Sequence, residues 1–335
     1  MSRPPVAFWS TLALALLGGC QAKEAAPLAD APPTWTDPSP HRTGFVPVNG
    51  NPLNYLDWGG SGTPLILIHG NGQNPHVFDD LAPALGGQFR IVAYARRGQG
   101  HSGKSGPFDT VTLTEDLRTL MDSLGIARAH MAGWSMGGNE ITMMAGKYPE
   151  RVGRLVYLDA AYDWSDPAFA AAFKELPIDL APKTETLASL DRYRAWHLAV
   201  FFPGVSDPTR LEGYVRDLID LQADGTVRPV APDSIAQALT ATVLTDQRDY
   251  RTVKAPALAI YSATFLDTVN GDSAQRARML AWEEKHIGPF RKKSIERVKR
   301  ELRSPEVVTV PGTHVDFVFT ARDQVVEAIR RFLAP

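Results

Sequence analysis

The chain of 335 residues contains a single cysteine, Cys20, so it cannot form an intramolecular disulfide. It has neither a second cysteine nor a His-x-x-x-His pair, and we therefore expect no metal site. No glycine-rich dinucleotide fingerprint follows the first predicted strand, so we also expect no cofactor. The net charge is −2 and the basic residues form no stripe, which argues against nucleic acid as a partner.

The N-terminus has the pattern of an export signal. Arg3 precedes an apolar run from Val6 to Leu17, which is too short to span a bilayer as the helix of a folded protein. Residues 1–19 therefore read as a signal peptide. Residues 20–42 are rich in alanine and proline and cannot build a core, so we interpret them as a tether that precedes the folded domain.

The end of the apolar run, Leu17-Gly18-Gly19-Cys20, resembles a bacterial lipobox. That resemblance implies that the signal is cleaved before Cys20 and that the thiol of Cys20 is lipidated. The lipid on Cys20 would then anchor the protein to a membrane. The expected location is the bacterial cell envelope, and Gln21 after the cysteine suggests the outer membrane if the cell has one. The alternative is a plain signal peptide with an incidental cysteine, which would give a secreted protein.

Beyond the tether, apolar runs alternate with amphipathic stretches. This alternation predicts a doubly wound, mostly parallel eight-stranded sheet of the α/β class. The predicted strands are 45–48, 53–58, 65–69, 90–95, 129–134, 155–159, 257–261 and 307–310. The predicted helices are 75–85, 112–124, 137–148, 273–302 and 321–333.

Residues 164–245 break the alternation and show helical patterns at 184–200, 208–221 and 233–240, without a clear strand. We expect them to form a helical cap inserted between strands six and seven. The core then comprises residues 43–163 and 246–335. An insertion at that point lies over the carboxyl edge of the sheet, where open α/β sheets bind ligands.

The segment from Gly133 to Gly137 has the form G-x-S-x-G and joins a predicted strand to a predicted helix. A serine on such a sharp turn is strained, and its hydroxyl is exposed above the sheet. Ser135 is therefore the candidate nucleophile. The pattern alone is weak, because ordinary strand-to-helix turns also contain glycine and serine.

Three further segments follow predicted strands: His69-Gly70-Asn71-Gly72, Arg97-Gly98-Gln99-Gly100-His101-Ser102 and Pro311-Gly312-Thr313-His314. In order and spacing, these segments and the serine turn resemble the α/β-hydrolase superfamily from about Thr43 to the end of the chain. The resemblance implies that His314 is the base that activates Ser135. It also implies an oxyanion hole formed by the backbone N–H groups of Asn71 and Met136.

The acid that completes the triad stays open. Most relatives carry it in a Gly-x-x-Asp turn after strand seven, but here that strand is followed by Ser262-Ala-Thr-Phe-Leu-Asp267 without the glycine. Asp159 ends strand six, where some relatives place their acid, and it is the favoured candidate. Asp267 and Asp163 are the alternatives. The carboxylate should hold the histidine in its productive tautomer.

These residues predict a serine hydrolase that acts on a small or medium ester-type substrate through an acyl-enzyme. The alternatives are a C–C hydrolase, a lactonase, a haloperoxidase-like enzyme or a non-catalytic, lipid-anchored binding module. We expect the aromatic residues of the insertion to form the insertion's own core, although they could instead line a substrate pocket. They are Trp164, Trp196, Phe201 and Phe202. We expect His69 and His130 to be structural, and His197 to be packed or solvated. The oligomeric state is not indicated.

Overall fold

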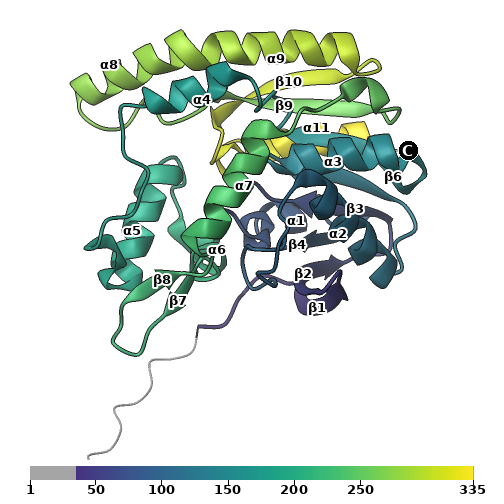
Figure 1. Ribbon diagram of the computed structural model, residues 1–335, viewed down its shortest axis with the longest axis horizontal. Helices are drawn as coiled ribbons and strands as arrows, with labels where there is room; N and C mark the ends of the chain where they lie inside the picture. Colours follow the sequence, from purple (N-terminus) through teal and green to yellow (C-terminus); the bar gives the residue numbers. More distant parts are fainter. Residues whose placement is uncertain (1–34, 335) are drawn as a thin grey trace, which may run out of the picture. The chain divides into compact units, whose positions relative to one another are not determined.

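The structure is a computed structural model that describes residues 35–334 (Figure 1). The chain divides into an N-terminal unit, residues 1–38, and a second unit, residues 39–335. The predicted signal peptide and Cys20 lie outside the described residues. All helices and strands given below belong to the second unit.

An eight-stranded sheet forms the centre of this unit, with the strand order β1-β2-β4-β3-β5-β6-β9-β10. Its strands are β1 (Arg42–Val48), β2 (Asn51–Gly59), β3 (Thr63–Ile68), β4 (Phe89–Tyr94), β5 (Ala129–Trp134), β6 (Val152–Leu158), β9 (Ala257–Thr264) and β10 (Glu306–Thr313). The pairs β1/β2 and β2/β4 are antiparallel, and every other neighbouring pair is parallel. The predicted doubly wound, mostly parallel sheet is therefore confirmed.

Helices cover both faces of the sheet because its central strands are apolar on both sides. In β3, Ile66 and Ile68 pack into one core cluster, while Leu65 and Leu67 pack into the other. The first face is covered by α2 (Thr110–Ser123), α3 (Gly137–Lys147), α8 (Ser273–Trp282) and α9 (Gly288–Glu301). The second face is covered by η1 (Pro75–Phe78), α1 (Leu81–Leu85), α10 (Phe317–Thr320) and α11 (Arg322–Leu333).

The long C-terminal helical segment is continuous, as predicted for 273–302, but a π-helical turn, η6 (Glu283–Ile287), joins α8 to α9. It lies along the edge of the sheet beside β9 and β10 (Figure 1). The short connecting turns are η2 (Pro149–Arg151) and η5 (Tyr250–Thr252). The predicted helix 75–85 is divided into η1 and α1.

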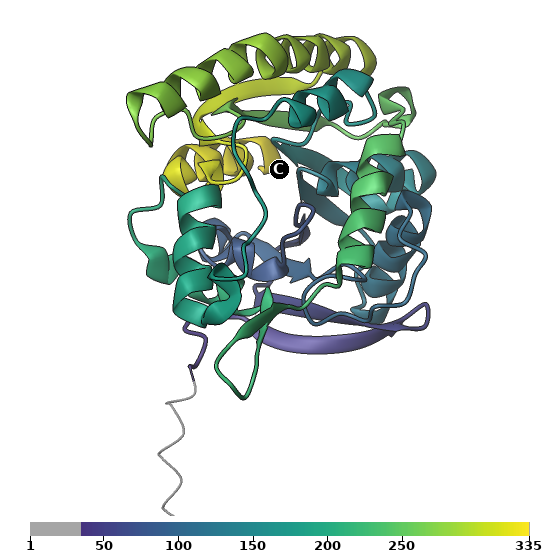
Figure 2. The ribbon, with the colours of Figure 1, turned by 60° about the vertical axis from the view of Figure 1, so that its left-hand side comes forward.

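The insertion lies between β6 and β9, and Figure 2 turns it towards the viewer. It contains α4 (Pro167–Lys174), η3 (Thr186–Ala188), α5 (Leu190–Phe201), η4 (Pro208–Leu211), α6 (Glu212–Arg216), β7 (Ile219–Leu221), β8 (Val227–Pro229) and α7 (Asp233–Thr245). The prediction of helix throughout 208–221 and of no strand was wrong. Gly225 has a φ of +85°, and the N–H of Thr226 donates to Asp224, which turns the chain into a β7–β8 hairpin.

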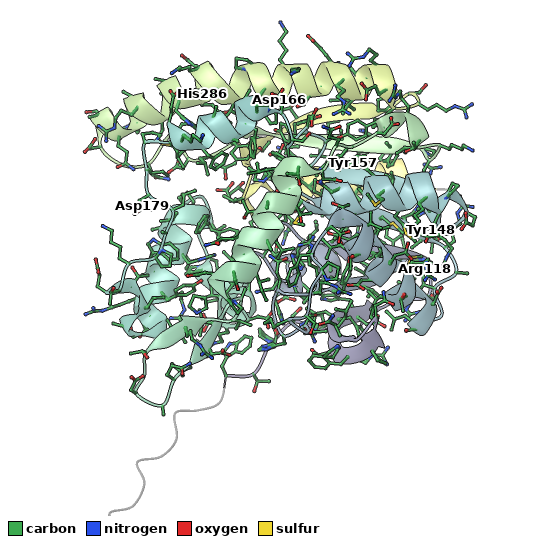
Figure 3. All side chains as sticks on the ribbon, in the orientation of Figure 1. Arg118, Tyr148, Tyr157, Asp166, Asp179 and His286 are labelled. Atoms are coloured by element: carbon green, nitrogen blue, oxygen red, sulfur yellow. The ribbon has the colours of Figure 1, made fainter. Side chains whose placement is uncertain are left out.

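Ion pairs tie α4 to the long C-terminal helical segment. Asp166 at the start of α4 pairs with Lys293, while Glu175 after its end pairs with Lys285 and His286. Asp166 and His286 are labelled in Figure 3, on adjacent helices. These contacts fix one side of the insertion to the core. Within residues 35–334, none of the helices has the length and apolar character needed to cross a membrane.

Candidate active site

Ser135 stands between β5 and α3, on the tight turn that the G-x-S-x-G pattern predicts. Its φ is +52°, a left-handed conformation that costs a non-glycine residue about 1–3 kcal/mol. The flanking positions, Gly133 and Gly137, leave no room for a side chain. A Cβ on Gly133 would lie 2.5 Å from the carbonyl carbon of Gly137, and a Cβ on Gly137 would lie 2.4 Å from the carbonyl oxygen of Ile68. The strained turn is therefore fixed by close packing of strand on helix.

His314 follows β10 and lies beside Ser135. The distance between His314 Nε2 and Ser135 Oγ is 2.9 Å. The backbone of His314 is held on both sides, because Trp134 Nε1 donates to its carbonyl oxygen at 2.8 Å and its N–H reaches the carbonyl oxygen of Phe265 at 3.1 Å. The Phe265 ring is stacked on the imidazole, with ring centroids 4.3 Å apart and an interplanar angle of 12°. These contacts fix both the position and the plane of the imidazole.

Asp159 is the carboxylate that contacts His314. His314 Nδ1 lies 2.7 Å from Asp159 Oδ2, and the Asp159 side chain is fully buried. Asp159 also accepts hydrogen bonds from Ser262 Oγ at 2.8 Å, from the Ser262 N–H at 3.1 Å and from Tyr162 OH at 2.9 Å. Burial and the adjacent Asp159 raise the pKa of Tyr162 well above its usual value, so its hydroxyl stays protonated and donates. The acid is thus desolvated but fully hydrogen-bonded.

The two alternative acids lie elsewhere. Asp267 accepts the backbone N–H groups of Val269 and Asn270 and stabilises a turn after β9. Asp163 pairs with Arg297 at 2.8 Å. Of the three carboxylates considered from the sequence, Asp159 alone is hydrogen-bonded to His314 within the described part of the chain.

Asn71 and Met136, the predicted oxyanion donors, flank the same serine. Met136 directly precedes α3, where the first N–H groups have no partner within the helix. A Cβ on Gly70 would come within 3.1 Å of Ser135 Cβ, so glycine lets this loop approach the nucleophile. The side chain of Asn71 donates to Thr240 Oγ1 of α7 at 3.0 Å, which links the loop to the insertion.

A buried ion pair that sequence reasoning missed supports the loop after β3. Arg96 pairs with Glu140 of α3, and both side chains are fully buried. The Arg96 guanidinium also donates to the carbonyl oxygens of His69 at 2.7 Å and Gly70 at 3.1 Å. Burial and the Arg96 charge lower the pKa of His69 well below its usual value, so His69 is neutral. It is structural, in agreement with its expected role. Arg96 directly precedes the Arg97-Gly98 segment, and nothing in its local sequence marks its partner.

A cavity of about 530 Å³ opens onto Ser135 and His314. Its walls are mainly apolar and come from α4, α5, α7 and the segment after β9. They include Trp164, Phe169, Phe173, Phe201, Val243 and Leu266. Besides Ser135 and His314, the polar residues of the lining are Asn71, Thr240 and Lys174. The arrangement places Ser135 and His314, the candidate nucleophile and base, at the wall of a mainly apolar pocket.

The expectation that the insertion's aromatic residues form its own core is only partly correct. Trp164 and Phe201 line the cavity, whereas Phe202 is buried against Tyr214 and Phe319. Trp196 packs on Phe201 from the side. The same set of rings therefore contributes both to the packing of the insertion and to the wall of the cavity.

His197 is buried among aromatic rings of the insertion, as expected for a packed residue. Its ring lies near those of Tyr193, Phe201 and Tyr214. Burial lowers the pKa of His197 to about 3, so the imidazole is neutral.

Residues 63–197 match the protein family described as alpha/beta hydrolase fold. The strand order and this match show that the chain has the alpha/beta hydrolase fold. Among curated relatives, the chain is 39% identical over 118 residues to the dihydrolipoyllysine-residue acetyltransferase component of an acetoin cleaving system of Pseudomonas putida, covering 34% of this chain and 31% of the relative. It is 37% identical over 102 residues to a putative non-heme chloroperoxidase of Synechocystis, covering 30% of this chain and 37% of the relative. The chain therefore spans about a third of the length of these relatives.

A solved structure, that of E-2-(acetamidomethylene)succinate hydrolase, has a TM-score of 0.70 to this chain. The alignment covers 88% of this chain and all of that one, with 22% sequence identity. At this identity the similarity shows a shared fold. Because it covers 88% of the chain, the shared fold extends well beyond residues 63–197.

Proposed function

We propose that the chain is a serine hydrolase that cleaves ester-type substrates through an acyl-enzyme. The observation that carries the proposal is the continuous chain of hydrogen bonds from Ser135 Oγ through the His314 imidazole to the Asp159 carboxylate, at 2.9 and 2.7 Å. A serine hydroxyl needs a base to become a nucleophile, and the base needs a fixed tautomer. This chain of contacts supplies both.

In the first step Ser135 Oγ attacks the carbonyl carbon, and His314 Nε2 takes the hydroxyl proton. The resulting imidazolium donates from Nδ1 to Asp159, which remains ionised. The tetrahedral oxyanion accepts hydrogen bonds from the N–H groups of Met136 and Asn71. Collapse of this intermediate breaks the bond to the alcohol, which leaves with the proton from His314.

In the second step a water molecule repeats the attack on the acyl carbon. His314 takes a proton from the water and returns it to Ser135 Oγ as the acyl bond breaks. The products are a carboxylic acid, an alcohol and the unchanged enzyme. The two steps together consume one ester and one water molecule, so all atoms and protons are accounted for.

The substrate class follows from the cavity. Apolar rings such as Phe169, Phe173 and Phe201 line most of a space of about 530 Å³, which accommodates a small or medium apolar acyl or alcohol group. Lactones share the same acyl–oxygen bond and are candidates on the same grounds. The intact set of nucleophile, base and acid favours an enzyme over a binding module.

The Ser135→Ala variant tests the proposal against a panel of p-nitrophenyl esters of graded chain length, with lactone and amide controls. We expect a loss of at least ~10³-fold in kcat, because only binding and the oxyanion hole remain. Ser123→Ala, an exposed serine at the end of α2, should keep full activity. A Ser135→Ala protein that keeps near wild-type turnover and is still labelled by a fluorophosphonate would disprove the mechanism.

We also propose that the enzyme lies in the bacterial cell envelope, held by lipid on Cys20 through the alanine- and proline-rich tether. The lipobox-like run Leu17-Gly18-Gly19-Cys20 supports this location. In a detergent phase-partitioning experiment the wild-type protein should enter the detergent phase, because two or more acyl chains anchor stably. Cys20→Ala should leave an active protein in the aqueous phase or block processing of the signal. A mature wild-type protein found wholly in the aqueous phase would refute the anchor.

A further inference from the structure

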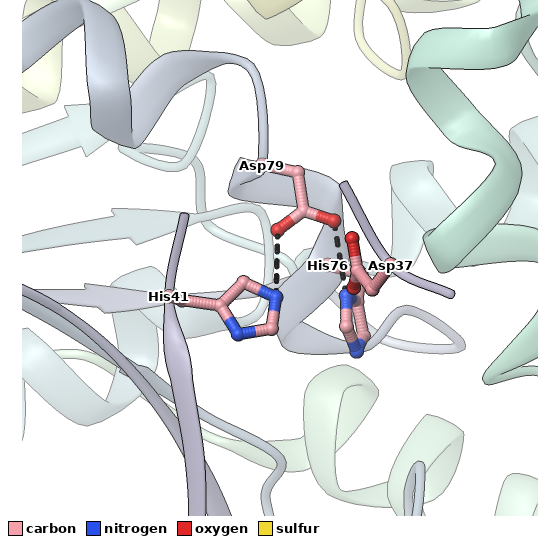
Figure 4. A group of neighbouring side chains, drawn as sticks. All are labelled: Asp37, His41, His76 and Asp79. Atoms are coloured by element: carbon pink, nitrogen blue, oxygen red, sulfur yellow. Dashed lines mark hydrogen bonds and ion pairs between the residues drawn. The ribbon is translucent and has the colours of Figure 1, made fainter. Parts of the chain in front are cut away.

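Two histidines and an aspartate meet away from the candidate active site. His41 directly precedes β1, His76 lies in η1, and Asp79 directly follows η1. Figure 4 shows the Asp79 carboxylate between the two imidazoles. Asp79 Oδ2 is 2.9 Å from His76 Nδ1, and Asp79 Oδ1 is 3.5 Å from His41 Nε2. Asp37, also drawn there, belongs to the N-terminal unit.

The distances fit a bound divalent transition-metal ion. Zinc binds imidazole nitrogen at about 2.0–2.1 Å and carboxylate oxygen at about 2.0–2.2 Å, which places tetrahedral ligand atoms about 3.3 Å apart. The two observed separations, 2.9 and 3.5 Å, lie on either side of that value. The candidate ligand atoms of His41, His76 and Asp79, all in the second unit, lie within 4.8 Å of one another. An ion can therefore contact the three residues after small side-chain movements.

One oxygen of the Asp79 carboxylate, Oδ1, has no hydrogen-bond donor among the described residues, whereas Oδ2 contacts His76. The side chains of His41, His76 and Asp79 are only 4%, 13% and 12% exposed. Among the residues that the structure describes, none donates a hydrogen bond to the buried Oδ1 of Asp79, and its ion pairs are with these histidines alone. A buried carboxylate oxygen without a donor is costly, and a cation removes that cost.

The imidazole of His41 is oriented for such a role. Its Nδ1 lies 3.4 Å from Thr43 Oγ1, so Nε2 is the nitrogen that faces Asp79. The Trp58 ring packs edge-on against the imidazole, with centroids 5.3 Å apart. Metal-binding histidines commonly have the second nitrogen hydrogen-bonded in this way, which fixes the tautomer.

We propose that His41, His76 and Asp79 form a binding site for Zn²⁺, with a fourth position left for water. Two imidazoles and a carboxylate are a donor set that zinc favours. The ion would tie the first residues of the second unit to η1 and so stabilise the fold. The site is independent of the proposed hydrolase activity. This proposal contradicts our expectation of no metal site. That expectation rested on the spacing of residues in the sequence, which does not show that His41 and His76, 35 residues apart, come together in the fold.

The experiment adds Zn²⁺ to the chelator-treated full chain and measures binding by titration calorimetry and thermal unfolding. We expect one ion per chain and a rise in Tm, because a ligand that binds only the folded state stabilises it. His41→Gln and Asp79→Asn should each weaken zinc binding by at least ~10-fold. Cobalt added to the wild-type protein should give the visible absorption of a four-coordinate ion, a readout that needs no variant.

Two control variants separate this site from other zinc ligands. His286 also pairs with a carboxylate, that of Glu175, but among the described residues no second imidazole joins that pair. The His286→Gln variant should therefore bind zinc normally. Cys20→Ala removes the single thiol and should also bind normally. The proposal is overturned if the wild-type protein retains no zinc after gel filtration. It is equally overturned if folded His41→Gln and Asp79→Asn proteins bind zinc as the wild type does, or if Cys20→Ala abolishes binding.

Discussion

Asp159 has two features that set it apart from the other carboxylates. Its φ is +44°, a conformation that aspartate tolerates better than most residues, and this turns its side chain back towards the end of β9. There Ser262 donates to it twice and Tyr162 once, so the charge is stabilised before His314 is considered. Such a preorganised carboxylate is suited to hold an imidazole in one tautomer.

We therefore expect Asp159→Asn to lower kcat by about 10³–10⁴-fold with little change in KM, because the amide favours the wrong tautomer and carries no charge. The measurement is steady-state kinetics with the best ester of the panel. Asp267→Asn is the matched control and should be nearly as active as the wild type, since Asp267 contacts backbone N–H groups of its own turn. Circular dichroism must first show that both proteins are folded. An inactive Asp267→Asn beside an active Asp159→Asn would reverse the assignment.

At the residue scale, the sequence singled out residues whose own segment carries a pattern, and the structure brings Ser135, His314 and Asp159 into contact. Ser135 is marked by glycines that the turn requires, and His314 by its loop after the last strand. Residues that act through long-range contacts left no such mark. Phe265 stacks on His314, and Arg96 supports the loop after β3, yet each is an ordinary residue in its own segment. Their roles depend on which distant residues the fold brings together.

At the element scale, the strands of the central sheet were predicted more accurately than the helices and strands of the insertion. Central strands such as β3 and β5 are buried on both faces, so their apolar runs stand out from the surrounding sequence. The insertion combines helices with several elements of only three to five residues. Its β7–β8 hairpin has strands of three residues each, too short for an alternating pattern to be distinguished from a helical one. An Asp-Gly pair such as Asp224-Gly225 is typical of a turn, but the three-residue strands on either side of it carry no pattern of their own.

The insertion contacts both the loop after β3 and the cavity beside Ser135. The side chain of Asn71, from the loop after β3, donates to Thr240 of α7, while α4 and α5 supply cavity walls such as Phe169 and Phe201. The same insertion therefore contacts the loop after β3 and shapes the cavity. Substrate selectivity should accordingly reside in the insertion, and the bond-breaking steps in the loops of the sheet.

At the scale of the whole molecule, buried neutral histidines link the stability of the fold to pH. Burial lowers the pKa of His197 to about 3, and burial also lowers the pKa values of His69 and His130. In the unfolded chain a histidine has a pKa of about 6.5. Between these values the unfolded state binds more protons than the folded state, so the free energy of unfolding decreases as the pH falls.

We expect the free energy of unfolding, measured by urea titration, to decrease as the pH is lowered from 7 to 5, with His197 alone contributing about 2 kcal/mol to the loss. His197→Phe replaces the imidazole with an apolar ring among aromatic neighbours and should reduce this loss. His101 provides a control of opposite sign, because its hydrogen bond to Asp217 raises its pKa. A raised pKa means that His101 stabilises the fold at low pH and that this stabilisation is lost as the pH rises. The His101→Gln variant should therefore lose slightly more free energy of unfolding than the wild type between pH 7 and 5. The difference is small because the His101 ring is exposed. If His197→Phe loses as much stability between pH 7 and 5 as the wild type does, His197 is not the group responsible.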